Sequence, residues 1–504
     1  MSTQDLPAEQ QHDVQPSNSE DLSSASPDNI TPPAVTLPTP SSSPTDTLSA
    51  SPSSSSSENS SPSISPLPET PPPPTPPQKD AVRGKKFRLL LACSFVAIVL
   101  LVGSLVGQFL LHSSNLPRLF SRSDETFVQP PLDQQQIDKL RHVADNLTYK
   151  QLAGLYVDRM TLDEEIGQVI MVEYSTGEYS PDLDTMIHDL HAGGVIMYQG
   201  QIITLDQTKH DTGEMQQRAT FPLLIGVDEE GWNVHRLTNI YPPRKSAGDI
   251  HDSGSVQLAT SEGTKVAHDL LSLGINTNFA PDVDVSKVEN YIGYDWRAFG
   301  DTPEDVIKYA GPYLRAMQAG GAIGTLKHFP GLGDVPRTTD PHGTLATVSH
   351  TKEQVNSIDL TPFAHFIQSQ DPLEQPGMIM STDVLVPSLD PRLVAEISPT
   401  IMTNVLRKQL GYDRVAVTDA LIMLGLQIDG RHLDLPEAGV RALNAGNDLL
   451  LGPSDPESMR SLVDAVKAAL KDGTIAKSRL DEAATRVLTL KMQRYLMPAV
   501  PPQA

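Results

Sequence analysis

The sequence predicts an α/β protein with a (β/α)₈ barrel, preceded by a disordered tail and one transmembrane helix. Three observations predict this order. The first 82 residues are dominated by Ser, Pro and Thr and offer almost nothing to bury. A long uncharged apolar run follows them. From about residue 134, short β-branched runs alternate with helical patterns up to about residue 497. Each part of the chain therefore has its own composition.

Residues 1–82 are predicted to be a disordered cytoplasmic tail. They hold most of the proline-rich stretches of a chain with 43 prolines and a formal net charge of −24. A segment with so little apolar surface cannot offset the entropy lost on ordering, so we expect disorder with polyproline-like pieces. The acidic balance of the whole chain gives no support to nucleic-acid binding.

Residues 83–112 are predicted to form a basic flank and a transmembrane helix. The 23 residues Leu89–Leu111 carry no formal charge. As a helix they span roughly 35 Å, enough for a hydrocarbon core of about 30 Å. A cleavable signal peptide is the alternative, but it would begin unusually late and have an unusually long apolar region. Four basic residues at 83–88 precede the span and only Arg118 and Arg122 follow closely. This bias predicts a single-pass protein of the cell membrane with a cytoplasmic N-terminus and an extracellular main domain.

The single cysteine, Cys93, lies within the predicted span. The outward part is therefore predicted to have no disulfide and to depend on its own core. We expect a juxtamembrane linker at 113–133, the barrel at 134–497 and a short tail at 498–504. The sequence leaves the oligomeric state open.

Eight candidate strands are short, apolar and rich in β-branched residues. Amphipathic segments such as "TPEDVIKYAGPYLRAMQAGG" separate them, often starting at Ser or Thr and ending at Gly. Apolar strands alternating with helices indicate a parallel sheet covered by helices. Eight such units favour a (β/α)₈ barrel, and a doubly wound sheet is the alternative. The candidate strands are residues 167–174, 193–198, 222–228, 275–285, 321–329, 377–384, 414–420 and 447–452.

Polar side chains follow five of these strands, at the end where barrel enzymes place their active sites. Any single one of them is also explained as a buried structural carboxylate. Their recurrence at one end favours a site, and converging carboxylates without cysteine suggest sugar chemistry more than a thiol or zinc site. We therefore expect no metal or organic cofactor. The strand-end residues are Asp228, Asp282, Asp284, Lys327, His328, Asp383 and Asp419.

An ordered set of motifs from about Met160 to Met492 resembles glycoside hydrolase family 3. The motifs are "GGVIMY", "LLIGVDEEG", "NFAPDVDV", "RAFGDTPEDV", "KHFPGLGD", "TTDPH", "RVAVTDAL" and "AGNDLLL". Within that family the chain is most similar to the single-domain bacterial β-N-acetylhexosaminidases. The resemblance implies a carbohydrate substrate and a retaining hydrolase that releases terminal β-linked N-acetylglucosamine. Cell-wall-type or other exported glycans fit the predicted outward position.

The resemblance also implies roles for individual residues. Asp419, in "VTDAL", matches the catalytic nucleophile of the family. The substrate-binding residues that it implies are Asp228, Arg297, Lys327 and His328.

The acid/base implied by the resemblance is His342, held by Asp340 in an Asp-x-His dyad on a loop. A retaining glycosidase needs a proton donor opposite its nucleophile that later becomes a base. Histidine already titrates near neutrality, and a neighbouring carboxylate can orient its ring. The spacing of Asp340 and His342 fits that role.

Five positions depart from the family pattern, among them Asn233, which stands in "DEEGWN" where the family has Arg. Leu332 stands in "PGLG" where a polar residue is common, and Trp232 replaces a glycine in "DEEGW". Asp383 stands where the family usually has His, and Pro341 sits inside the dyad. Because proline fixes its own φ and restricts the residue before it, we expect a stiffer dyad loop.

Two alternative functions stay open. A family 3 β-glucosidase or β-xylosidase usually takes its acid/base from a second domain, for which we expect too little chain after the barrel. A non-hydrolytic surface sugar-binding protein is the other alternative. The sequence also leaves open whether water or phosphate accepts the sugar.

Overall fold

Eight parallel strands form a closed barrel in the computed structural model, which describes residues 148–497. Each strand pairs with its neighbour in chain order, and β1 pairs with both β2 and β12 to close the ring. All eight predicted strands are present, and the closed ring decides for the barrel against the doubly wound sheet. The strands are β1 (Ile170–Val172), β2 (Gly194–Ile196), β3 (Leu224–Val227), β6 (Thr277–Asn278), β7 (Ile323–Phe329), β8 (Met378–Ser381), β9 (Val415–Ala420) and β12 (Leu449–Leu451).

Several predictions concern parts of the chain outside the described residues. These are the tail at 1–82, the flank and membrane span at 83–112, the linker at 113–133, the predicted barrel start at 134 and residues 498–504. Within 148–497, no helix has both the length and the apolar character needed to cross a bilayer.

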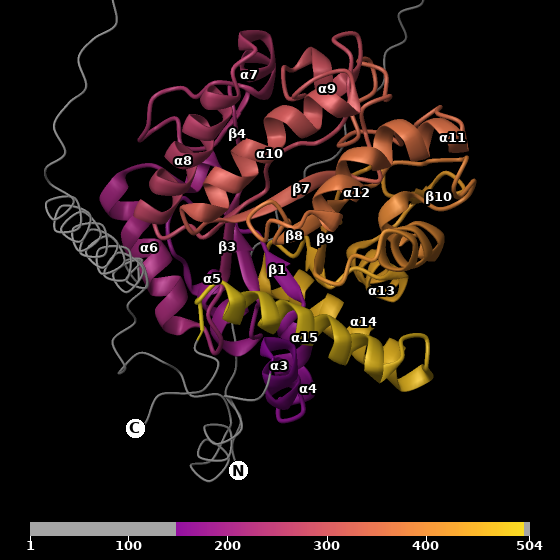
Figure 1. Ribbon diagram of the computed structural model, residues 1–504. Helices are drawn as coiled ribbons and strands as arrows, with labels where there is room; N and C mark the ends of the chain where they lie inside the picture. The colour runs from indigo at the N-terminus through magenta and orange to yellow at the C-terminus, as the bar shows by residue number, and fades with distance from the viewer. Residues whose placement is uncertain (1–147, 498–504) are drawn as a thin grey trace, which may run out of the picture. The chain divides into compact units, whose positions relative to one another are not determined.

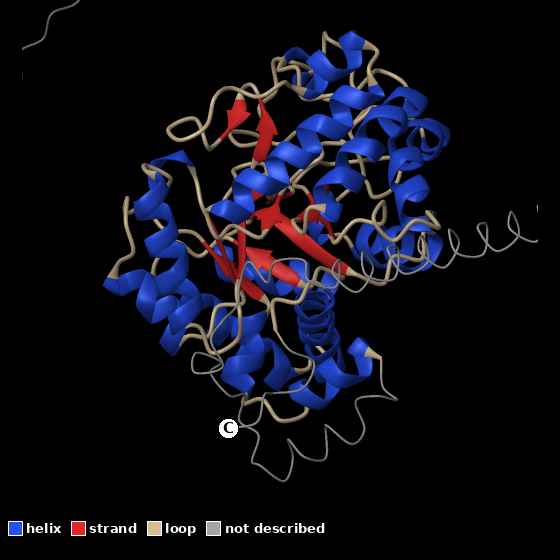
Figure 2. Ribbon diagram, turned by 60° about the vertical axis from the view of Figure 1, so that its left-hand side comes forward, coloured by secondary structure: helices blue, strands red, loops and turns tan. Residues whose placement is uncertain are grey.

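Helices surround the barrel and connect each strand to the next (Figures 1 and 2). Two of them, α3 and α4, precede β1, and α14 and α15 follow β12. The longer helices are α3 (Tyr149–Val157), α4 (Leu162–Gln168), α6 (Leu205–Arg218), α7 (Ala247–Ser253), α8 (Val256–Ser272), α10 (Pro303–Ala319), α12 (Leu360–Gln368), α13 (Leu435–Ala445), α14 (Pro456–Asp472) and α15 (Lys477–Gln493). The other helical segments are η6 (Thr400–Gln409) and seven segments of three to five residues, α5 (Pro181–Asp184), η2 (Thr185–Asp189), η3 (Gln199–Gln201), α9 (Tyr291–Tyr294), α11 (Lys352–Gln354), η4 (Val355–Asp359) and η5 (Ala395–Ile397).

Helix α10 shows how the local sequence sets these boundaries. Thr302 caps the helix by accepting a hydrogen bond from the Asp305 backbone N–H, and Pro303 occupies the first turn. Both choices satisfy or avoid an unpaired backbone donor at the start of a helix. Its apolar face, which includes Val306 and Leu314, is buried. The pattern read from "TPEDV" therefore marks the true start of this helix.

The core has two layers, one inside the barrel and one between strands and helices. Every residue of β7 is buried, as expected for a parallel strand covered on both faces. From α15, Val487 and Leu490 pack against the inner layer. The barrel strands contribute to that layer Met171, Ile196, Leu224, Phe279, Ile323, Met378, Met380, Val415, Val417, Leu449 and Leu451.

Two connections extend beyond the barrel at the end where the strands finish, which we call the mouth. The first holds the hairpin of β4 (Glu229–Gly231) and β5 (Val234–His235) after β3. The second, residues 330–351 between β7 and α11, carries the predicted dyad. Its two ends are fixed by backbone hydrogen bonds, Tyr291 N–H to Val335 O at 2.9 Å and Val348 N–H to Leu385 O at 2.9 Å. The stem of this loop is thus tied to the barrel.

Candidate active site

A buried network of ion pairs lies at the mouth where β3 and β7 end. Lys327 Nζ lies 2.6 Å from Asp228 Oδ1 and 2.6 Å from Glu230 Oε1. Arg297 binds the same glutamate with two nitrogens, at 2.8 and 3.0 Å. Burial alone raises the pKa of Glu230, but Arg297 and Lys327 outweigh it and hold that pKa below its ordinary value. The network therefore presents fixed charges of both signs.

His328 is neutral and oriented by a buried carboxylate. Its Nδ1 lies 2.7 Å from Asp284 Oδ2, and the other oxygen of Asp284 accepts the Leu332 backbone N–H at 2.7 Å. Burial lowers the pKa of His328 to about 4. The Nδ1–H donates to Asp284, which leaves Nε2 as an acceptor 3.4 Å from Arg297 Nη2.

Asp282, Asp284 and His328 also offer three ligand atoms within 4.8 Å of one another, a grouping that a divalent cation can use. The Arg297 guanidinium already lies there, with Nη2 3.5 Å from Asp282 Oδ2. A metal ion would be repelled by that positive charge. Arg297 thus takes the place of a cation in this arrangement.

Asp419 stands at the end of β9 and is partly exposed to the mouth. Thr382 Oγ1 donates a hydrogen bond to its Oδ2 at 3.2 Å, and the Ala420 N–H contacts Oδ1 at 2.9 Å. Its charge acts on His328 and on Glu173, which follows β1. Burial raises the pKa of Glu173 to about 7, and Asp419 and Asp228 act in the same direction. Glu173 therefore lies close enough to both aspartates to feel their charges.

The predicted dyad forms at the tip of the 330–351 loop. His342 Nδ1 lies 2.8 Å from Asp340 Oδ1, and the same oxygen accepts the His342 backbone N–H at 3.0 Å and the Tyr291 hydroxyl at 3.2 Å. Partial burial opposes ionisation of Asp340, but the bonds from His342 prevail and lower the pKa of Asp340. Both side chains are well exposed, Asp340 at 62% and His342 at 67%. Since Nδ1 faces Asp340, Nε2 is the nitrogen available for proton transfer.

The tip of the 330–351 loop is hydrogen-bonded to the segment that follows Asp419. Leu424 N–H donates to His342 O at 3.2 Å, and Pro341 is buried between its two exposed neighbours. Asp383, fully buried at the end of β8, feels the charges of both Asp419 and Asp340. The dyad and the strand-end carboxylate therefore flank one region of the mouth.

Residues 161–490 match the family described as "Glycosyl hydrolase family 3 N terminal domain". The chain belongs to glycosyl hydrolase family 3. The predicted resemblance is thereby confirmed. The chain is 30% identical to "Beta-hexosaminidase A" of Pseudoalteromonas piscicida over 375 residues, covering 66% of this chain and 61% of that protein.

Solved structures of family 3 have the same architecture. A β-N-acetylglucosaminidase from Paenibacillus sp. str. FPU-7 is 33% identical, with a TM-score of 0.62 over 67% of this chain and 63% of the other. A β-N-acetylhexosaminidase from Beutenbergia cavernae is 27% identical, with a TM-score of 0.58 over 65% of this chain and 98% of the other. The chain thus spans less than two thirds of some relatives and nearly all of others.

The structure places all seven predicted site residues of this family 3 chain at the mouth. It joins Asp228, Lys327, Arg297 and His328 through one network, with Glu230 at its centre. It joins Asp340 to His342 as a separate pair, and Asp419 stands apart from both groups of contacts. Four residues near these side chains were not predicted from the sequence. Glu173 could have been predicted, because it stands at the end of a strand, as Asp419 does. The four residues are Glu173, which ends "GQVIMVE", and Glu230, Tyr291 and Glu396.

The departures from the family pattern occupy different surroundings. Leu332 is buried, and its backbone N–H binds Asp284. Trp232 is 57% exposed with φ of 52° at the turn of the β4–β5 hairpin, so it lies on the rim. Asp383 is fully buried near Asp419, and so is Glu396, which lies in η5. Burial and neighbouring carboxylates raise the pKa of both well above their ordinary values.

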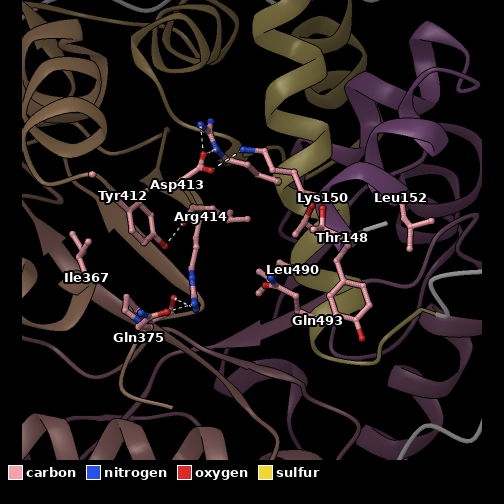
Figure 3. Close-up of a pocket in the computed structure, with 16 residues that line it drawn as sticks. Thr148, Lys150, Leu152, Ile367, Gln375, Tyr412, Asp413, Arg414, Leu490 and Gln493 are labelled. Carbon is pink, nitrogen blue, oxygen red and sulfur yellow. Dashed lines mark hydrogen bonds and ion pairs between the residues drawn. The ribbon is translucent and has the colours of Figure 1, made fainter. Parts of the chain in front are cut away.

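A pocket of about 830 Å³ lies at the opposite end of the barrel, which we call the base (Figure 3). It is lined by the start of α3, residues 411–415 ahead of β9, and the last turns of α15. Its charges bind one another: Lys150 Nζ lies 2.7 Å from Asp413 Oδ2, and Arg486 Nη2 lies 3.0 Å from Asp413 Oδ1. Both oxygens of Asp413 are therefore bound by cationic side chains.

Proposed function

We propose that this chain is a retaining β-N-acetylhexosaminidase that releases terminal β-linked N-acetylglucosamine from cell-wall-type or other exported glycans. The observation that carries the proposal is the pairing at the mouth of a partly exposed strand-end carboxylate, Asp419, with a histidine oriented by a carboxylate, His342. The names of the relatives from Pseudoalteromonas, Paenibacillus and Beutenbergia support the substrate class.

In the first step, Asp419 attacks the anomeric carbon as the bond to the leaving group breaks. His342, protonated and held through Nδ1 by Asp340, transfers its Nε2 proton to the departing oxygen. The leaving group departs as an alcohol and a glycosyl ester forms on Asp419. General acid catalysis of this kind is typically worth about 10²–10⁴ in rate.

In the second step, His342 is neutral and its Nε2 removes a proton from water. The water oxygen attacks the anomeric carbon, the bond to Asp419 breaks, and the sugar leaves with net retention. A neutral base does not repel an anionic acceptor, so phosphate is a second acceptor to be tested.

The buried network is suited to hold sugar hydroxyls. A hydroxyl both donates and accepts hydrogen bonds, and the network offers both kinds of partner. Asp228 accepts, Lys327 donates, and Arg297 and His328 lie beside them. Because these groups already bind one another, they are positioned before the sugar arrives, and little reorganisation opposes binding.

The test of the activity is release of nitrophenol by the full chain from the β-N-acetylglucosaminide and from the β-glucoside. We expect turnover of the first to exceed that of the second in phosphate-free buffer. Preference for the glucoside would favour the β-glucosidase alternative, and binding of sugar without turnover of either would favour a binding protein. A sugar phosphate formed in phosphate buffer would identify phosphate as an acceptor.

The residue roles need separate tests. His342→Ala is expected to slow substrates with poor leaving groups far more than activated aryl glycosides, since only the former need the proton. Equal losses on both would refute the acid role. A covalent adduct trapped with a fluorinated N-acetylglucosaminide should map to Asp419, and mapping to another residue would refute the nucleophile.

We also propose that the barrel is held outside the cell by the apolar run at 89–111, with the N-terminal tail in the cytoplasm. The uncharged length of that run and the basic residues before it support this orientation. Protease added to intact cells should cleave an epitope after residue 497 and spare one at the N-terminus. The reverse result would refute the orientation.

A further inference from the structure

Asp383 has a buried carboxyl group, and one of its oxygens lacks a hydrogen-bond partner among the described residues. Asp383 is the second residue after β8 and is 0% exposed. Thr382 Oγ1 lies 3.4 Å from its Oδ1, whereas no described residue donates a hydrogen bond to its Oδ2. A buried polar atom without a partner is costly, so an occupied contact is expected there.

The unpartnered oxygen points at the dyad loop. A Cβ built on Gly425 would lie 2.2 Å from Asp383 Oδ2 and 2.8 Å from the Pro341 carbonyl oxygen. Both oxygens therefore lie beside the space that a side chain at position 425 would fill, and glycine leaves that space open. Pro341 is the residue between Asp340 and His342, and it is buried at this contact.

A hydrogen bond to the Pro341 carbonyl would give Asp383 Oδ2 the partner that it lacks within 148–497. A carbonyl can only accept, so the proton has to come from the carboxyl. The ionisable groups that face Asp383 are Asp419 from β9, Glu396 from η5 and Asp340 from the dyad loop. All three are carboxyls. Burial and the charge of Asp419 raise the pKa of Asp383 well above its ordinary value, which keeps the proton on it.

We propose that Asp383 is a positioning residue: as a neutral acid it donates its O–H to the Pro341 carbonyl and holds the dyad loop against the mouth. The hydrogen bond from Leu424 N–H to His342 O, on the other side of Gly425, completes the attachment. The consequence for His342 rests on the function proposed above, whereas the attachment of the loop does not. Loss of the proton from Asp383 removes this hydrogen bond and releases the loop tip.

The test compares three variants of the full chain. Asp383→Asn keeps the shape and a donor that does not titrate. Asp383→Leu removes the donor. Glu396→Gln is the matched control, since it neutralises a neighbouring buried carboxyl that is not among the atoms nearest Gly425.

Hydrogen exchange of the peptide covering residues 338–344 reports the attachment without any activity. After correction for intrinsic exchange, protection in the wild type should fall as pH rises. Protection in Asp383→Asn should be independent of pH, and in Asp383→Leu it should be about tenfold lower at low pH. Glu396→Gln should keep a pH-dependent protection.

Turnover of a substrate with a poor leaving group, N,N′-diacetylchitobiose, supplies the second readout. The alkaline fall of kcat/KM should be shallower in Asp383→Asn than in the wild type, and it should not vanish, because the proposed acid step still needs a protonated His342. Asp383→Leu should lose about tenfold on this substrate and little on the nitrophenyl glycoside. Identical pH dependence of protection in the wild type and Asp383→Asn would overturn the proposal, even if Asp383→Leu fails to fold. Absence of turnover by the wild type would instead count against the proposed function alone.

Discussion

The two ends of the barrel both contain buried charges, but they satisfy them differently. At the base, Asp448 precedes β12 and is fully buried. Burial alone raises its pKa, but Arg407, Arg479 and Arg486 outweigh this and hold the pKa below its ordinary value. They contact its carboxylate at 2.5, 2.6 and 3.1 Å.

At the mouth, by contrast, Asp383 and Glu396 have raised pKa values and Asp419 is partly exposed. A cluster whose charges are all neutralised by partners stabilises the fold. One that keeps excess carboxyls beside an open surface is suited to chemistry.

The largest expected effect concerns Asp419 at the mouth. Asp419→Ala should lower kcat/KM by about 10⁴-fold or more, because it removes the proposed nucleophile. The free energy of unfolding should change little, since Asp419 is partly exposed. Nitrophenol release and urea denaturation measure the two quantities. A large loss of stability with activity retained would mean that Asp419 stabilises the fold, as Asp448 does at the base, and would contradict the proposed difference between the two ends.

The base should respond in the opposite way. Asp448→Asn keeps the shape of the side chain but removes the buried carboxylate that three arginines share. We expect a loss of about 3–5 kcal/mol in the free energy of unfolding, because breaking a buried ion pair leaves uncompensated charge. The kcat of the folded protein should be unchanged. Loss of kcat at full stability would mean that the base takes part in catalysis.

A smaller effect is expected for Lys491, which lies near the base and is fully buried. Its Nζ donates to Gln168 Oε1 at 2.7 Å, and burial lowers its pKa to about 7. The ordinary value is about 10.4. Between these values the unfolded chain binds more protons than the native protein, so stability should rise with pH from about 7 to 10. Lys491→Met should remove that rise. Tm measured across this range decides it, and an unchanged rise in the variant would contradict the assignment.

The smallest expected effect concerns Glu173 at the mouth. Its pKa is raised to about 7, so it changes charge near the pH of assay. Glu173→Gln keeps its size and removes that titration. We expect less than a tenfold change in kcat/KM and a flatter pH profile around 7, because the charge beside Asp419 no longer varies. A profile identical to the wild type would place Glu173 outside the pocket that the substrate occupies.

The fold was predictable because parallel strands buried on both faces leave a strong apolar signal. The seven proposed site residues were located at strand ends and by motif. Other parts of the site depend on tertiary contacts. Glu229 and Glu230 are adjacent in the sequence, yet Glu229 turns to His235 and Arg244, both at 2.5 Å, while Glu230 turns to the mouth. Successive side chains on β4 point to opposite sides, which explains the difference. The composition of the segment does not predict which side faces the mouth.

Tyr291 illustrates the same limit. Its hydroxyl binds Asp340 from 49 residues upstream, and the contact exists only because α9 is tied to the stem of the dyad loop. No local spacing marks such a partner. Asp383 was noted at a strand end, but its contact with Gly425 and Pro341 needs the folded chain.

The stem of the 330–351 loop has a consequence for how this enzyme class can change. The groups proposed to contact the sugar lie in β7 and directly after β3, whereas the proposed proton donor lies on a loop whose stem is bound through Val335 and Val348. Insertions or replacements between those two points leave the strands and their pairing untouched. The preference for the sugar and the preference for the leaving group can therefore diverge independently. The barrel can stay unchanged while the 330–351 loop is replaced.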